Sequence, residues 1–128
     1  MDSETRLFLD HAEQARKFLD QSDKEFADDD VLQGSEKLWG AACQAVMAVA
    51  KSRGWDYGKS EHRSVVIDRL VEERGDSSLA SGYSVAQKFH ANFYNNFMED
   101  DDIARDRPIV HQLVERLLNG ELSKPRSE

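Results

Sequence analysis

A histidine and an arginine at an expected helix start are the residues of this chain best suited to bind an anion. His62 and Arg63 follow Ser60 and Glu61, a pair typical of the beginning of a helix. Free backbone amides at a helix N-terminus and a guanidinium group both bind phosphate or carboxylate groups. The pattern therefore predicts a small anion site. The alternative is an exposed first turn in which Glu61 offsets the positive charge.

A second histidine, His90, lies on an apolar stripe of an expected helix at 79–98, between Ala86 and Phe93. Histidines in such positions are commonly neutral core residues with a hydrogen bond to a neighbouring helix. The other interpretation is a role in ligand binding. We keep both, and we count His90 with His62 and Arg63 as the candidate ligand-binding residues.

Acidic side chains occur in two runs, at 28–30 and at 99–102, each ahead of an expected helix start. Three consecutive aspartates do not have the spaced ligands of a calcium loop. Carboxylates ahead of a helix cap its free amides and interact favourably with its dipole. We therefore expect helix caps rather than a metal site, and the sequence predicts no cofactor.

The 128 residues carry a net charge of −8, and 33% of them are charged. A chain of this length forms one domain with one core. Its acidity does not suit a protein that coats nucleic acid, because such binding depends on Lys and Arg. The single cysteine, Cys43, excludes an intrachain disulfide and predicts a reducing compartment. Because no apolar run approaches the ~20 residues of a membrane span, we expect a cytoplasmic protein without a membrane segment.

The segment at 31–53 is the one around which the others must pack. Its apolar residues recur at steps of three and four positions, which is typical of a helix. One stripe contains Trp39 and Val46, and a second consists mostly of small residues, which lets another helix approach closely. The pattern predicts a central helix buried on at least two sides, with Trp39 as a central packing residue.

The same periodicity predicts helices at 3–22, 61–74 and 79–98, and a last helix that begins near Asp106 and ends at Asn119. Asp106 is expected to be the N-cap of that helix, with Pro108 in its first turn. Short connections between the helices favour antiparallel neighbours. The sequence thus predicts an all-α, up-and-down bundle of four to five helices over 1–120, followed by a disordered tail at 121–128.

The chain resembles the PaREP branch of the HEPN superfamily, helical-bundle proteins named for nucleotide binding in higher eukaryotes and prokaryotes. Three stretches carry the resemblance, SEKLWGAACQAVMAVAKSRGW, SEHRSVV and KFHANFYNNF, and it covers about 7–118. The resemblance implies a HEPN-like bundle that pairs as a homodimer. It also implies a setting in a toxin–antitoxin or other defence system.

Catalytic HEPN relatives are metal-independent RNases that carry an arginine followed, four to six residues later, by a histidine. Arg105 and His111 match this pattern, with the polar Asp106 directly after the arginine, and Arg6 and His11 have a similar spacing. The resemblance then implies that neutral His111 accepts a proton from an RNA 2′-hydroxyl. Arg105 would stabilise the charge that develops on the phosphate. If the last helix begins near Asp106, both side chains can face one cleft near its N-terminus.

Three functions from different classes therefore stay open. The first is a non-catalytic interaction module, a homodimer that binds a partner protein or a nucleotide. The second is a metal-independent RNase that uses Arg105 and His111 on an RNA substrate. The third is a structural or regulatory subunit of an assembly. We favour the first, because the resemblance supports it and the chain contains no complete catalytic constellation.

Overall fold

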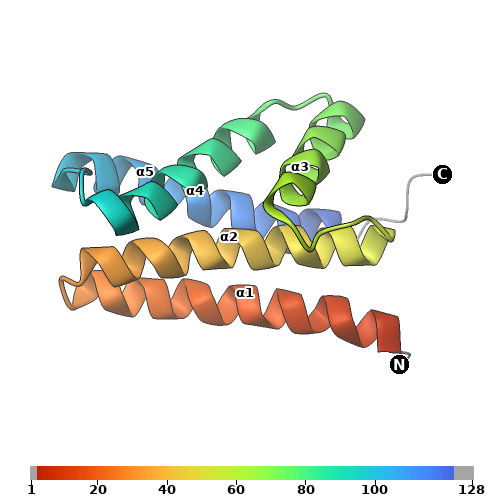
Figure 1. The fold of residues 1–128 in the computed structure, drawn as a ribbon, viewed down its shortest axis with the longest axis horizontal. Coiled ribbons are helices and arrows are strands. Elements are labelled where there is room, and N and C mark those ends of the chain that lie inside the picture. Colours follow the sequence, from red (N-terminus) through yellow and green to blue (C-terminus); the bar gives the residue numbers. More distant parts are fainter. Residues whose placement is uncertain (1–2, 123–128) are drawn as a thin grey trace.

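The computed structural model describes residues 3–122, with side chains from residue 9 onward, and the regular elements of this part are all helices (Figure 1). In chain order they are α1 (Ser3–Ala27), α2 (Val31–Arg53), α3 (Ser60–Arg74), α4 (Ser78–Asn95) and α5 (Asp100–Glu115), which continues as a π-helical segment, η1 (Arg116–Glu121). The predicted all-α class is confirmed. None of these helices is both long and apolar enough to cross a membrane.

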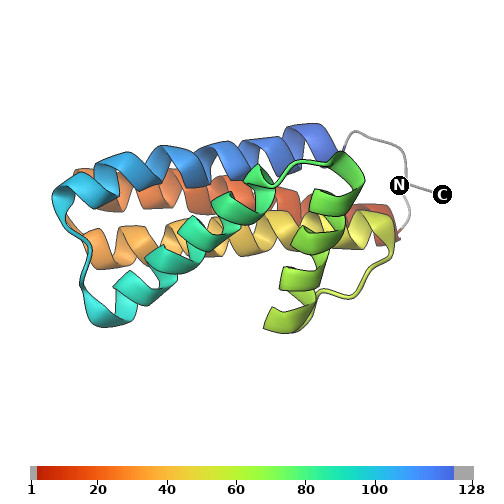
Figure 2. The same cartoon turned by 90° about the horizontal axis from the view of Figure 1, so that it is seen from above.

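The helices differ in their direction relative to the long axis of the molecule. Figures 1 and 2 show that α1, α2 and α5 run along the long axis of the molecule and that α4 crosses them obliquely. In both views α3 stands steeply to that axis. This short helix buries only Val66, Ile67 and Leu70, so it contacts the rest along a narrow strip. The predicted up-and-down order therefore describes four of the helices, and α3 departs from it.

The central helix predicted from the sequence is α2, with the expected bounds. Its stripe of small residues is buried, and α1 approaches it closely at two glycines. The Phe26 ring lies over Gly34, and the Phe18 ring lies over Gly40. The Ser22 hydroxyl donates a 2.8 Å hydrogen bond to the Gly34 carbonyl oxygen. Because a larger side chain at either glycine would hold α1 away, these positions set the spacing of the two helices.

The first helix is longer than predicted and ends at Ala27 rather than at Ser22. The polar residues after Ser22 interrupt the apolar periodicity, but Phe26 still reaches the core. Its ring packs edge-on against Phe89, with the ring centroids 6.3 Å apart. Phe26 lies over α2 only because α1 continues past Ser22. Tertiary packing therefore sets the end of α1, although the local sequence pattern predicts an earlier end.

The turn between α1 and α2 uses the first acidic run. Asp29 has a left-handed backbone, with a φ of 63°, which reverses the chain. The Asp30 carboxylate then accepts a 3.1 Å hydrogen bond from the backbone N–H of Gln33. At the other end, α2 stops at Gly54, whose φ of 74° suits glycine. The predicted capping role is thus confirmed at Asp30.

A buried amide ends α4 before the predicted position 98. Asn92 is fully buried, and its side-chain oxygen accepts hydrogen bonds from the backbone N–H groups of Phe97 at 2.9 Å and Met98 at 2.8 Å. Its amide nitrogen donates a 3.1 Å bond to the Ser35 hydroxyl on α2. Asn96 takes a left-handed backbone with a φ of 47°. The connection to α5 is therefore fixed by one side chain.

The predicted start of the last helix near Asp106 is wrong, because α5 begins at Asp100. The acidic run before it supplies the cap: the Glu99 N–H donates a 3.0 Å hydrogen bond to the Asp102 carboxylate. Asp106 lies inside the helix and is buried, and Pro108 also lies in the helix interior. Acidic residues that can cap a helix stand both at 99–102 and at Asp106. The sequence favoured a start at Asp106, because proline is typical of a first helical turn.

A buried ion-pair network closes the opposite end of the bundle. The Arg53 side chain is 2% exposed and binds Glu73 at 3.0 Å and Glu121 at 2.8 Å. Arg74 binds the same Glu121 carboxylate at 2.8 Å. Glu121 therefore packs with the helices, whereas the sequence placed it in the tail. The rest of that predicted tail, 123–128, lies outside the described residues.

We expect Gly34→Ala to lower the free energy of unfolding by ~1–3 kcal/mol, measured by urea denaturation. A Cβ atom at this position would lie 2.8 Å from carbons of the Phe26 ring, so α1 must shift. Alanine is otherwise favoured in a helix by about 1 kcal/mol. Gly58→Ala is the control, because nothing lies within 4 Å of its added Cβ atom. A Gly34→Ala variant more stable than the wild type would contradict the close approach of α1.

Candidate functional site

A groove of about 560 Å³ opens between α2, α3 and α4. It contains two of the three predicted ligand-binding residues, Arg63 from α3 and His90 from α4. The complete lining is Trp39, Ser60, Glu61, Arg63, Ser64, Tyr83, Gln87 and His90. Aromatic, cationic and uncharged polar groups converge here from three helices. We call this site the α2–α3–α4 groove.

One wall of the groove is aromatic. Trp39 lies 5.6 Å from Tyr83 and 5.1 Å from His90 between ring centroids, and its plane is inclined by 28° to the His90 ring. The sequence predicted Trp39 as a central packing residue, but it is only partly buried at the edge of the core. The exposed part of its side chain faces the groove. The exposed parts of these rings can pack against a planar or apolar group.

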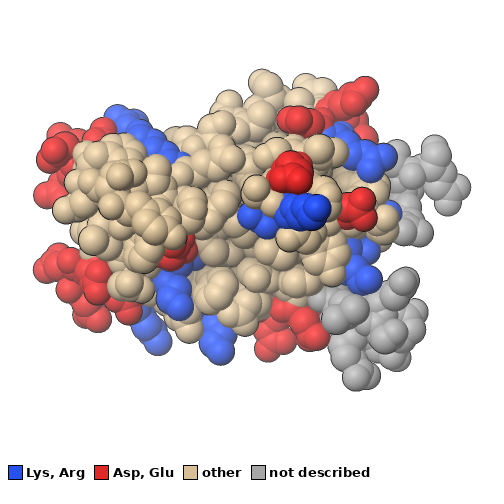
Figure 3. Space-filling model, in the orientation of Figure 1, with Lys and Arg blue, Asp and Glu red and all other residues tan. Residues whose placement is uncertain are grey.

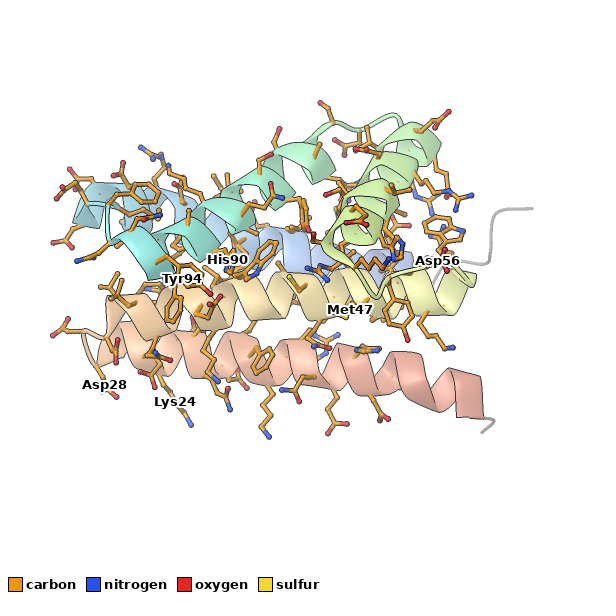
Figure 4. The ribbon with its side chains drawn as sticks, viewed as in Figure 1. Lys24, Asp28, Met47, Asp56, His90 and Tyr94 are labelled. Carbon is orange, nitrogen blue, oxygen red and sulfur yellow. The ribbon has the colours of Figure 1, made fainter. Side chains whose placement is uncertain are left out.

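The ring of His90 is held from two sides. Its Nδ1 atom lies 3.0 Å from the Glu36 carboxylate on α2, and Tyr94 contacts the ring edge-on at 5.3 Å between centroids. Figure 4 shows His90 and Tyr94 as neighbours on α4. The side chain of His90 is 41% exposed. The predicted partner on a neighbouring helix is therefore present, whereas the ring is not fully buried.

The positive charge of the groove comes from Arg63. Its guanidinium forms no ion pair with any carboxylate of the described residues. Its Nε atom is buried without a hydrogen-bond partner, and the group interacts with the Tyr83 hydroxyl and the Cys43 thiol. Because guanidinium groups bind carboxylates and phosphates strongly, this arrangement can receive the anionic group of a ligand.

The two weak acids beside Arg63 stay protonated at neutral pH. Burial raises the pKa of the Cys43 thiol to about 12, although Arg63 acts in the opposite direction. Burial also raises the pKa of the Tyr83 hydroxyl. A thiol acts as a nucleophile only as the thiolate. Cys43 is therefore an inert residue in this surrounding.

The third predicted ligand-binding residue, His62, lies outside the groove lining. Its Nδ1 atom accepts a 3.3 Å hydrogen bond from the backbone N–H of Lys59, ahead of α3. This ring thus belongs to the cap of α3, while the next residue, Arg63, lines the groove. The structure brings Arg63 together with His90 and separates both from His62.

Arg105 and His111 lie on different sides of α5. They are separated by about 120° around the helix axis, because six residues make one turn and two thirds of another. Arg105 binds Asp106 at 3.0 Å and Asp102 at 3.1 Å, whereas His111 lies 3.0 Å from Asp23 of α1. The prediction that both face one cleft depended on a helix start near Asp106, which the structure does not have.

The buried Asp106 carboxylate holds Arg105 in place. Burial acts to raise the pKa of Asp106, but hydrogen bonds from Arg105 and from Lys88, the latter at 2.8 Å, outweigh it and lower the pKa. The group is therefore ionised at neutral pH. Its negative charge pairs with the Arg105 guanidinium, which therefore already has a carboxylate partner within the same chain.

His111 borders an open depression of about 610 Å³ on α5, together with Arg107. The Arg107 guanidinium lies over the Phe26 ring at 4.2 Å and binds Asp23 at 3.1 Å. Both side chains thus share the Asp23 carboxylate. Arg107 and His111 thus each have a partner on α1, and this surface of α5 contacts α1 through them.

Sequence reasoning missed Trp39, Tyr83 and Gln87 as groove residues. A signal was present on α4, because Tyr83, Gln87 and His90 follow one another at steps of four and three positions. Three side chains with polar tips on one helical stripe are unusual for a stripe that faces only the core. Trp39 gave no such signal, since its neighbours on the stripe are buried.

The described residues define an all-α bundle with a mixed aromatic and cationic groove, and no group of three His, Cys, Asp or Glu side chains among them could hold a metal ion. The archaeal PaREP1/PaREP8 family matches residues 10–114. The chain therefore belongs to this family, which confirms the PaREP part of the resemblance. No curated protein and no solved structure matches the chain.

We expect Cys43 in the native protein to react with an aromatic disulfide reagent at pH 8 at least ~100-fold more slowly than in the urea-unfolded chain. The thiol is buried and its pKa is raised to about 12, so thiolate forms only as the pH rises toward that value. Absorbance of the released thiol measures the rate. The exposed Ser84→Cys position in a Cys43→Ala background is the reactive control. Equal rates for Cys43 in the native and unfolded chains would refute its burial.

Proposed function

We propose that this protein is a non-catalytic binding module whose α2–α3–α4 groove takes a small ligand with a planar ring and one anionic group. Nucleoside monophosphates are the class that fits this description. The observation that carries the proposal is Arg63, a cation without a carboxylate partner among the described residues, beside the aromatic wall. The groove volume of about 560 Å³ lies in the range of small-molecule sites.

The charges around the groove favour one anionic group over several. Glu61 belongs to the lining, and Glu36 binds His90 at 3.0 Å. A triphosphate would bring more negative charge to these carboxylates than a monophosphate does, and Arg63 is the single arginine or lysine of the lining. The hydroxyl of Ser64 and the amide of Gln87 remain for hydrogen bonds to a ring edge. We infer a preference for a monophosphate.

The proposal stops at binding. Cys43 and Tyr83 have raised pKa values, so neither supplies a nucleophile at neutral pH. Arg105 and His111 have separate carboxylate partners within the chain. An RNase site made of Arg105 and His111 would thus require both of these contacts to be replaced.

Affinity for AMP, measured by isothermal titration calorimetry, tests the proposal. We expect wild-type protein to bind AMP, and Arg63→Gln to weaken binding by ~10–100-fold, because a hydrogen-bonded charge contributes about 1.5–3 kcal/mol. Arg69→Gln is the matched control. Arg69 is on the same helix and, like Arg63, has no carboxylate partner among the described residues. It stacks on Trp55 at 4.4 Å and lies outside the groove lining. ATP should bind more weakly than AMP.

Thermal melts of the three proteins show whether each variant is folded at the titration temperature. Equal affinity of AMP for the wild type and the folded Arg63→Gln variant would refute the assigned role of Arg63. Absence of any AMP binding at millimolar concentration would refute the ligand class.

We also propose that the chain is a HEPN-type bundle that acts as a homodimer, in a toxin–antitoxin or other defence system and in the cytoplasm. The sequence stretches at 36–45 and 90–94 support this assignment, and they fall within the part matched by the PaREP1/PaREP8 family. The third possibility, a structural or regulatory subunit, would leave the groove without a ligand. Titration with AMP distinguishes it from the binding module.

Light scattering at tens of micromolar protein should give twice the chain mass of 14.6 kDa. Dimerisation is expected from the resemblance, from the apolar or small residues on more than one side of α2, and from the aromatic and aliphatic side chains of α4 and α5. A monomeric mass would overturn the homodimer. It would also remove any composite RNase site in which Arg105 and His111 come from two chains.

A further inference from the structure

Two aromatic side chains three positions apart in the chain are exposed at one end of the bundle, away from the ion-pair network of Glu121. Tyr94 at the end of α4 is 70% exposed, and Phe97 in the following connection is 46% exposed. The other large apolar side chains with high exposure among the described residues are Leu9 on α1 and Val65 on α3. Aromatic side chains are enriched at protein interfaces.

The Tyr94 ring and the backbone at Phe97 are held in place before any partner binds. The Tyr94 ring contacts His90 and Phe93 edge-on, with centroid distances of 5.3 and 5.0 Å. The backbone N–H of Phe97 donates to the buried Asn92 side chain at 2.9 Å. A ring that is already ordered loses little conformational freedom on binding. Tyr94 is therefore suited to act as a rigid anchor.

Carboxylates flank this aromatic pair on two sides. Glu99, Asp100 and Asp101 follow Phe97 in the chain, and none of them forms an ion pair within the described part of the protein. The turn at 28–30 lies at the same end of the bundle (Figures 1 and 2). Figure 3 shows acidic groups above and below an uncharged area at this end. We call the exposed rings with these carboxylates the acidic end surface.

The charge of this surface decides between the possible occupants. Phosphate groups of nucleic acid and anionic lipid headgroups would be repelled by the carboxylates. In a two-fold dimer the same patch meets itself, so a second copy would place acidic groups against acidic groups. A partner of opposite charge is complementary. These considerations leave a basic segment of a different protein.

We propose that the acidic end surface binds a segment of a partner protein in which an apolar side chain is flanked by Lys or Arg residues. The apolar side chain packs on the exposed rings of Tyr94 and Phe97, and the flanking cations approach Glu99, Asp100 and Asp101 and the turn at 28–30. This surface is separate from the Arg63 side of the α2–α3–α4 groove. A failure to bind AMP therefore does not bear on it.

Fluorescence anisotropy with three short labelled peptides tests the proposal on the full-length protein. The probe alternates Lys with Leu, one control peptide has Ser in place of Leu, and the other has Glu in place of Lys. We expect the Lys/Leu peptide to bind most tightly, and its affinity to fall between about 50 mM and about 300 mM NaCl as screening increases. Tyr94→Ser combined with Phe97→Ser should weaken its binding by ~10-fold or more.

Two further variants separate the contributions. Val65→Ser removes another exposed apolar side chain on α3 and should leave the affinity unchanged. Asp100→Asn combined with Asp101→Asn should reduce the salt dependence of binding. Circular dichroism melts verify that each variant is folded. None of the substitutions removes a group that Asn92 contacts.

Equal binding of the Lys/Leu and Lys/Ser peptides would show charge attraction alone and overturn the proposal. So would equal affinity of the folded Tyr94→Ser, Phe97→Ser variant for the Lys/Leu peptide. If light scattering shows that this double substitution converts a dimer to a monomer, the surface belongs to a second copy and the basic partner is excluded.

Discussion

Burial of α2 along nearly its whole length is the constraint on which the remaining structure depends. A helix surrounded in this way needs small residues wherever a neighbour passes close to its backbone, and Gly34 and Gly40 take the rings of Phe26 and Phe18. The long α1–α2 hairpin forms a layer on which α4 and α5 pack. Trp39 of the groove projects from this layer, and His90 belongs to α4, which packs on it.

The groove follows from the way α3 meets this layer. With only Val66, Ile67 and Leu70 buried, α3 stands steeply to the long axis and does not cover the middle of α2. Trp39 and His90 are thereby left partly open, and Arg63 lies beside them without an ion pair to any carboxylate of the described residues. In a regular antiparallel bundle, a helix in the place of α3 would cover these rings. An irregular packing angle therefore creates the candidate site.

Local patterns in the sequence were sufficient where one signal decided the structure. The bounds of α2 were predicted correctly, because Asp30 caps one end, Gly54 the other, and apolar periodicity is continuous between them. The prediction failed where two signals competed: Asp106 with Pro108 offered a helix start that the run at 99–102 also offered. Inside α5, Asp106 is buried and pairs with Lys88 of α4, a contact between helices that local pattern does not contain.

For the candidate site, the sequence supplied Arg63 and His90 but not their association. Their positions belong to two helices, and only the tilt of α3 brings them to one groove. His62 contacts Lys59 at the start of α3 and does not line the groove. Residue type and helical position could thus be predicted, while the relative placement of helices depends on the sum of many packing contacts.

The Glu121 network has a consequence for synthesis of the chain. Arg53 and its carboxylate partner Glu121 are separated by 68 positions, and the arginine side chain is 2% exposed in the finished protein. An unpaired charge in such a place is strongly unfavourable. Until residue 121 has left the ribosome, the end of α2 can be neutralised by Glu73 alone. Native closure of this end therefore takes place only once residue 121 is available for packing.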